Sequence, residues 1–144
     1  MNIQALYETD FNSWIQENIA LLKQARFSEI DTNHLIEELE DMGKSNKHAL
    51  KSRIIVLVTH LLKWQYQQEN QSTSWEGSIK EQRRRLALLL KDFPSLKNAI
   101  NEAIQEGYDD AVEWAADETG FKKNTFPSQC PYTSNQLLDK SFYP

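Results

Sequence analysis

The residues best suited to chemistry lie in one short string, His60-Leu61-Leu62-Lys63-Trp64-Gln65-Tyr66-Gln67. On a helix, His60, Lys63, Trp64 and Gln67 share one stripe, because residues three, four and seven apart project from the same face. His60 is then a candidate general base and Lys63 a candidate anion-binding group, with Trp64 and Gln67 as candidate binding residues. The alternative, which we prefer, is a hydrogen-bonded histidine at the edge of the core beside a packed tryptophan.

A second string carries residue types that bind metals: His34, Glu37, Glu38 and Glu40. Helical bundles that hold two metals use Glu-x-x-His from two helices, together with further glutamates. Here the order is reversed, His34-x-x-Glu37, and no histidine follows His60. We therefore expect no metal site and no cofactor, and we interpret these carboxylates as capping or solvated groups.

Other catalytic classes lack their sequence signatures. The four glycines are isolated, and Gly43-Lys44-Ser45 lacks the first glycine and the preceding strand of a phosphate-binding loop. The serines, histidines and aspartates have no nucleophile-elbow context. Cys130 is the only cysteine, so an internal disulfide is excluded, and we expect an inert or partly buried thiol.

The formal net charge of −5 conceals a strong segregation along the chain. Residues 1–43 carry a net charge of −7, residues 44–97 a net charge of +7, and residues 98–144 a net charge of −5. An exposed basic surface would bind an anionic partner such as RNA, with Arg83, Arg84 and Arg85 as candidate contacts. We prefer internal compensation between acidic and basic helices, because Glu76–Lys80 and Glu81–Arg85 are favourable i,i+4 pairs.

The apolar periodicity predicts an all-α bundle of four to five helices. A first helix is expected over residues 10–26, and Asp31 or Thr32 begins a helical stretch that ends near residue 69. This stretch is either one very long helix or two helices joined at a kink near Gly43. We favour the break, because an uninterrupted helix of about 38 residues would span about 57 Å. The all-round apolar run Ile54–Val58 predicts a central, fully surrounded helix, with the core at Ile54–Leu62.

The second half of the chain predicts two more helices and a tail. Thr73 with Glu76 suggests a capping box that opens a helix ending near residue 92, and another helix should run over residues 96–119 to Gly120. Their apolar faces include Trp75, Phe93 and Trp114, and Gly107 should permit close helix packing. Residues 121–144 form a mostly extended tail that packs on the bundle, with a capping box at Thr133 and Gln136. Its apolar residues are Phe121, Phe126, Tyr132, Leu137 and Leu138.

The length of 144 residues suits one domain over residues 1–144. Since 40% of the residues are hydrophobic, the chain can fill a core. The start of the chain lacks the basic patch and apolar run of a secretory signal. The longest apolar stretch, Ile54–Val58, is far shorter than the roughly 20 residues that cross a bilayer. We therefore expect a protein of a bacterial-type cytoplasm that does not enter membranes.

Several strings together resemble a known family. They are Leu6-Tyr7…Asp10-Phe11…Trp14, Glu37-Glu38-Leu39-Glu40-Asp41-Met42-Gly43, His60-Leu61-Leu62-Lys63-Trp64, Ser74-Trp75…Ile79…Gln82-Arg83-Arg84-Arg85 and Cys130-Pro131-Tyr132…Leu137-Leu138. The whole chain resembles the bacterial helical family catalogued as domain of unknown function number twenty-nine, which is common in cyanobacteria. The resemblance implies a small, single-domain α-helical protein, and it implies no activity, substrate or catalytic residue.

We expect a non-enzymatic intracellular interaction or regulatory module that binds an as yet unidentified protein partner. The first alternative is RNA binding through the basic middle of the chain. The second is an enzyme with its site near His60.

Overall fold

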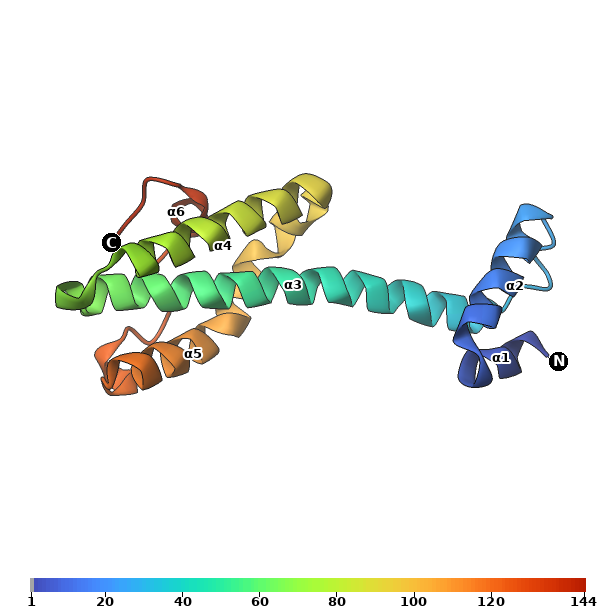
Figure 1. Cartoon of the computed structure of the whole chain (residues 1–144), viewed down its shortest axis with the longest axis horizontal. Helices are drawn as coiled ribbons and strands as arrows, with labels where there is room; N and C mark the ends of the chain where they lie inside the picture. Colours follow the sequence, from blue (N-terminus) through green and yellow to red (C-terminus); the bar gives the residue numbers. More distant parts are fainter. Residues whose placement is uncertain (1) are drawn as a thin grey trace. The chain divides into compact units, whose positions relative to one another are not determined.

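The computed structural model describes residues 2–144, which contain helices and loops but no strand (Figure 1). The all-α class predicted from the sequence is therefore confirmed. The residues group into two compact units, one ending at Lys44 and the other spanning Ser45–Pro144. The expectation of a single domain stays a prediction.

The first unit contains α1 (Ile3–Thr9), α2 (Phe11–Lys23) and the first turns of α3 (Thr32–Tyr66). The sequence prediction missed α1 and extended α2 to residue 26. Ala25 explains the earlier end, since it adopts a left-handed conformation with φ 58°. Arg26 N donates to Leu21 O at 2.9 Å and Ala25 N to Leu22 O at 3.0 Å, the pattern that closes a helix C-terminus.

Polar groups hold the centre of the first unit. Trp14, Asn18 and Asp31 are each only 2% exposed. Trp14 Nε1 donates to Asp31 Oδ2 at 2.9 Å, and Asp31 N donates to Asn18 Oδ1 at 2.9 Å. His34 Nδ1 lies 2.6 Å from the same Asp31 Oδ2, and the Tyr7 ring stacks on the His34 ring with centroids 3.9 Å apart. Asp31 therefore joins α2 to the start of α3.

The predicted break at Gly43 is wrong, because α3 is continuous over its 35 residues. A Cβ added at Gly43 would meet no atom within 4 Å, so no packed neighbour requires a bend there. A helical glycine costs about 1 kcal/mol relative to alanine, which alone does not interrupt a helix. The argument that a helix of this length does not fit assumed one compact body. The residues of α3 are instead divided between two units.

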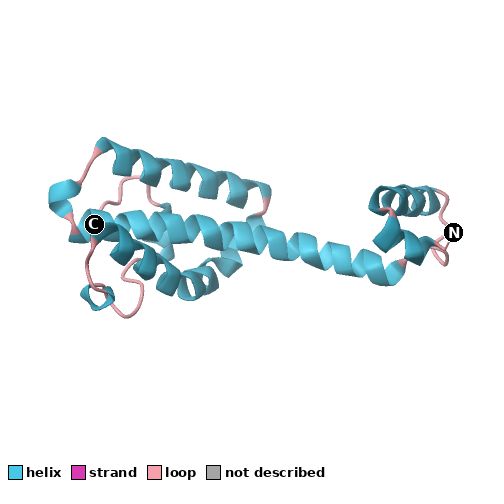
Figure 2. Ribbon diagram, turned by 60° about the horizontal axis from the view of Figure 1, so that its bottom comes forward, coloured by secondary structure: helices cyan, strands magenta, loops and turns pink. Residues whose placement is uncertain are grey.

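The second unit is built around the later part of α3. Figures 1 and 2 show α4 (Thr73–Asp92) and α5 (Ile100–Thr119) running along it on different sides. Short 3-10 turns lie at Gln68–Asn70, Pro94–Ala99 and Lys123–Thr125, and α6 (Ser134–Leu138) lies near the end of the chain. The predicted core is confirmed in position, with Ile54, Leu57, Val58, Thr59, Leu61 and Leu62 at most 2% exposed.

This core is a stripe rather than a fully surrounded segment. Ile55, Val56 and His60 are only partly buried. The buried positions recur at three and four residues, so one wide face of α3 is covered and the opposite face reaches solvent. The prediction of an all-round buried helix was therefore too strong.

Several predicted helix ends are confirmed, but α5 begins at Ile100 rather than at residue 96, because Pro94–Ala99 form a 3-10 turn. The end of α4 at Asp92 and the left-handed Gly120 cap of α5, with φ 76°, match the predictions. The capping box of Thr133 and Gln136 is present at α6. The capping box predicted for Thr73 and Glu76 is wrong, because Ser72 is the N-cap and its side chain accepts from Trp75 N.

Gly107 allows the close packing of α5 on α3 that the sequence predicted. A Cβ at this position would lie 2.7 Å from Ile55 Cγ1 and 3.3 Å from Ile55 Cδ1. No ordinary side chain approaches so closely, so the helix spacing depends on glycine here.

The C-terminal segment covers the core as predicted for Phe126, Tyr132 and Leu137, which are at most 5% exposed, whereas Leu138 is 36% exposed. The predicted burial of Phe93 and Trp114 is wrong, since each is 41% exposed. Trp114 instead donates from Nε1 to Glu118 on its own helix at 3.0 Å. An aromatic residue at the margin of an apolar face can satisfy its polar edge in this way.

We predict that Asp31→Asn destabilises the first unit by about 1–3 kcal/mol, because a buried carboxylate loses charge-assisted hydrogen bonds. Burial raises the pKa of Asp31, but the hydrogen bonds from Trp14 and His34 outweigh it and leave the pKa below its usual value. The carboxylate therefore stabilises the fold above the unfolded pKa of about 3.9 and loses this effect as the pH falls through the lower folded pKa. Urea unfolding followed at the Trp14 indole NH tests this, with Glu17→Gln as an exposed control. An unchanged midpoint for Asp31→Asn would contradict it.

Alanine at two helical glycines should have opposite effects. Gly107→Ala should destabilise by about 1–3 kcal/mol, because Ile55 must move. Gly43→Ala should stabilise by about 0.5–1 kcal/mol, because it adds helix propensity in open space. Thermal unfolding measures both, and in an Ile55→Ala background the penalty at Gly107 should disappear. A penalty that persists there would refute the role of Ile55.

Candidate functional site

The strongest polar cluster around the predicted site is centred on Lys63 and Glu118. Lys63 Nζ donates to Glu118 Oε2 at 2.6 Å, and the lysine side chain is only 8% exposed. The same ammonium lies 4.6 Å from the centroid of the Trp75 ring, and Glu118 Oε1 accepts from Trp114 Nε1 at 3.0 Å. The cluster thus joins α3, α4 and α5 through one buried cation.

Electrostatics at this cluster favour a stable ion pair. Burial raises the pKa of Glu118, but the hydrogen bond and charge of Lys63 outweigh it and leave the pKa below its usual value. The amine of Lys63 is thereby committed to a carboxylate and an aromatic face. This arrangement connects α3 to α4 and α5.

His60 makes its hydrogen bond within α3, and its charge also helps to lower the pKa of Glu118, the partner of Lys63. The His60 Nδ1 lies 2.9 Å from Val56 O on the same helix, so this nitrogen carries the proton that the carbonyl accepts. Among residues 2–144, no hydrogen bond reaches Nε2. Trp64 packs against Tyr143, with ring centroids 5.1 Å apart, and Gln67 precedes the 3-10 turn after α3. His60, Lys63 and Trp64 thus have different hydrogen-bond or ring partners, and whether the four side chains form one site stays a prediction.

The three arginines predicted to contact RNA have different environments. Arg83 is 3% exposed; its Nε donates to Leu137 O at 2.9 Å and its Nη2 donates to Gln136 O at 3.2 Å. Arg84 and Arg85 both bind the Glu81 carboxylate, at 2.7 and 2.8 Å. The predicted Glu76–Lys80 pair is also present, at 3.0 Å. Part of the basic middle is thus compensated internally, and Arg83 is a structural clamp on the C-terminal segment.

Two of the residues considered for a metal, His34 and Glu38, make other contacts. His34 pairs with Asp31, and the Glu38 carboxylate accepts from the Tyr7 hydroxyl at 2.6 Å. Within residues 2–144, no three histidine, cysteine, aspartate or glutamate side chains gather so that they could hold a metal ion.

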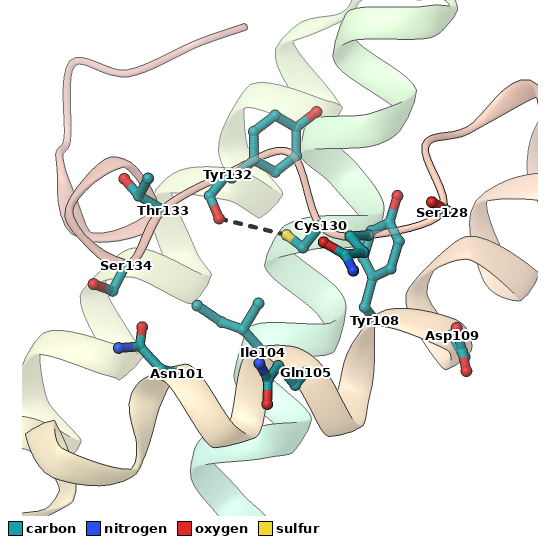
Figure 3. A pocket seen from close by; sticks show the side chains of 11 residues that line it. Asn101, Ile104, Gln105, Tyr108, Asp109, Ser128, Cys130, Tyr132, Thr133 and Ser134 are labelled. Atoms are coloured by element: carbon teal, nitrogen blue, oxygen red, sulfur yellow. Dashed lines mark hydrogen bonds between the residues drawn. The ribbon is translucent and has the colours of Figure 1, made fainter.

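An open pocket of about 610 Å³ lies between α5 and the C-terminal segment (Figure 3). Asn101, Gln105 and Tyr108 reach it from the helix, while Ser128, Cys130 and Thr133 are among those from the segment. Asp109 is the only charged side chain in its wall. Apart from Cys130, the sequence analysis did not single out these residues, because they come from two segments that fold together only in space.

The pocket offers hydrogen bonds rather than a nucleophile. Cys130 Sγ donates to Tyr132 O at 3.6 Å, and burial raises the pKa of this thiol. Burial likewise raises the pKa of Tyr108, whose hydroxyl donates to Pro127 O at 2.7 Å. Both groups stay protonated near neutral pH, in agreement with the inert, partly buried thiol predicted for Cys130. The wall suits an uncharged or cationic polar ligand.

Comparison with known families gives a match over residues 6–143, to the family described as domain of unknown function DUF29. The chain belongs to the DUF29 family. The match runs through both compact units and includes α2 and the last turn of α1. No curated protein and no solved structure matches the chain. Family membership therefore shows which residues of the chain are similar to the family, and it assigns no activity.

Exposed apolar side chains of this DUF29 member are concentrated in the first unit. Among residues 2–144, eleven large hydrophobic side chains are at least 36% exposed, and seven of them precede Lys44. These seven are Phe11, Ile19, Leu22, Phe27, Ile36, Leu39 and Met42. An apolar side chain in water gains free energy when another surface covers it. The sequence showed the apolar periodicity but suggested burial within a single bundle.

No helix of the part that the structure describes has both the length and the apolar character required to span a membrane.

We predict that Glu118→Gln destabilises the DUF29 fold by about 1–2 kcal/mol, because the buried Lys63 ammonium loses its carboxylate, whose side chain is 38% exposed. Since the pKa of Glu118 is lowered, this contribution is present above its unfolded pKa of about 4.3 and disappears as the pH falls through the folded value. Urea titrations between pH 3 and pH 7 measure it. Lys63→Met with Glu118→Gln should recover much of the loss, and His60→Ala, which leaves the Lys63–Glu118 pair in place, should cost less. Equal losses in all variants would contradict the ion-pair role.

Proposed function

We propose that this chain is a non-enzymatic interaction module whose residues 1–44 bind a protein partner. The proposal rests on the concentration of exposed apolar side chains in the first unit. Leu39 is 64% exposed and Met42 62% exposed on α3, three residues apart on one side of the helix. Large apolar side chains are the usual anchors of protein interfaces.

The charge of the same residues defines the partner's chemistry. Residues 1–43 carry a net charge of −7, with acidic side chains next to the apolar ones, as in Glu37-Glu38-Leu39-Glu40-Asp41-Met42. A partner that combines an apolar centre with a basic rim would complement this surface and associate faster at low salt. A single-stranded or double-stranded RNA would be repelled by it.

Other observations favour binding over catalysis. His60, Lys63 and Trp64 have different hydrogen-bond or ring partners, and the Lys63 ammonium is paired with Glu118. The RNA alternative is less favoured, because Arg83 is buried and Arg84 and Arg85 are paired with Glu81.

We place the module in the bacterial cytoplasm, which is consistent with a lone free thiol, Cys130.

Photo-crosslinking tests the proposal. A photoreactive amino acid at Leu39, in the cells that make the protein, should give one dominant cross-linked protein, identified by mass spectrometry. Binding of that purified protein to the full chain should weaken as salt rises, because the contact is partly electrostatic. Leu39→Glu with Met42→Glu should raise the Kd at least 10-fold, since charged side chains would be buried in the interface.

Phe93→Glu is the matched control, since Phe93 is an exposed apolar residue of the second unit, at 41% exposure. It should leave the Kd unchanged. Sedimentation equilibrium separates the alternative of self-association: a dimer abolished by the Leu39 and Met42 substitutions would assign the surface to a second copy. A partner that binds equally well to both glutamate variants would overturn the proposal.

A further inference from the structure

A second open pocket, of about 460 Å³, lies along α4 beside the C-terminal segment. Its charged wall residues are all basic: Lys80, Arg83, Arg84, Lys91 and Lys140. No acidic residue lines it, in contrast to the pocket beside α5, where Asp109 is the only charge. Five cations around one hollow create a positive potential that attracts an anion.

Arg83 gives this pocket a buried, pre-positioned cation. The side chain has two hydrogen bonds to the carbonyls of Gln136 and Leu137, while its Nη1 is buried without a hydrogen-bond partner. Within residues 2–144, no carboxylate lies within ion-pair distance of Arg83. The charge of Asp139 acts on Arg83 without forming an ion pair, so the guanidinium, which is 3% exposed, is only partly compensated. The neighbouring Tyr143 hydroxyl is also buried and unpaired, and the Tyr143 ring centroid lies 5.5 Å from Arg83 Cζ.

Two further cations of the wall are uncommitted. Lys80 pairs with Glu76 and Arg84 with Glu81, but Lys91 and Lys140 have no ion pair in the described part of the chain. These two lysines come from α4 and from the segment after α6, so they approach the pocket from different parts of the chain. An anion between them would be held by both.

The remaining wall is apolar. Ala87 and Leu88 line the pocket, and Leu88 is 47% exposed. A purely inorganic anion would leave this surface in water. A ligand with an anionic head and a short hydrocarbon part would satisfy both kinds of wall, since apolar area removed from water contributes about 25 cal/mol per Å².

We propose that this pocket binds a phosphorylated amphiphile, with its phosphate among Arg83, Lys91 and Lys140 and its hydrocarbon part on Leu88. Guanidinium and ammonium groups together are the usual phosphate ligands of proteins. The ligand is either a soluble phosphate monoester or the headgroup region of an anionic lipid. This site is independent of the interaction surface on residues 1–44.

Calorimetric titration of the full chain tests the proposal with three probes: n-octyl phosphate below its micelle concentration, inorganic phosphate and n-octanol. The octyl phosphate should bind with 1:1 stoichiometry and at least 10-fold more tightly than either fragment. Its addition should shift the Arg83 guanidinium NMR signals. In a separate experiment, binding of the full chain to vesicles of phosphatidic acid in phosphatidylcholine is measured. Binding to vesicles without binding of octyl phosphate would assign the site to a lipid, and binding of octyl phosphate alone to a soluble ester.

Lys91→Ala with Lys140→Ala should weaken binding at least 10-fold, whereas Lys97→Ala with Lys122→Ala should not change it. These control lysines are exposed and lie outside the pocket wall. The pocket variant leaves Arg83 and its contacts in place, and an unchanged thermal midpoint will verify its fold. Binding that survives the pocket variant, equal binding of octanol, or no binding in either experiment would overturn the proposal.

Discussion

The architecture of the second unit depends on one constraint, the burial of an apolar stripe on α3. Leu57, Leu61 and Leu62 are fully buried, and α4, α5 and the C-terminal segment are the elements that remove this stripe from water. Burial of each such side chain contributes about 1.5–3 kcal/mol, so no other feature of the unit has comparable weight. The close approach at Gly107 and the Lys63–Glu118 pair follow from how α5 must pack to cover the stripe. In the first unit, the buried carboxylate of Asp31 and its hydrogen bonds take the place of an apolar core.

The features predictable from the sequence were those with local signals. Helical periodicity located the core at Ile54–Leu62, and Gly120 and the Thr133–Gln136 pair marked helix ends correctly. Each of these depends on residues within a few positions of one another, where propensity and hydrogen bonding act directly. Gly107 was also informative, because a glycine among apolar residues of a helix indicates close packing.

The features that escaped the sequence depend on distant partners or on strain. Nothing near Arg83 indicates that it will bind carbonyls 53 and 54 residues later, and its two arginine neighbours suggested a surface cluster instead. Lys63 meets Glu118 across 55 residues in the same way. The end of α2 depends on Ala25 in a conformation that alanine rarely adopts. The pocket in Figure 3 combines residues of α5 with residues 128–134, so its lining has no sequence signature.

The late position of the C-terminal segment has a consequence during synthesis on the ribosome. The hydrogen bond from Tyr7 to Glu38 in the first unit spans 31 residues and can form early. The buried stripe of α3 emerges next, but Phe126, Tyr132 and Leu137 leave the ribosome about 70 residues after it. Until then part of the stripe remains a hydrophobic surface on a nascent chain, which is the kind of surface that chaperones bind. The same delay makes the docking of this segment, through Arg83 to Gln136 and Leu137 and through the Tyr132 hydroxyl to Gln65, the closing step of vectorial folding.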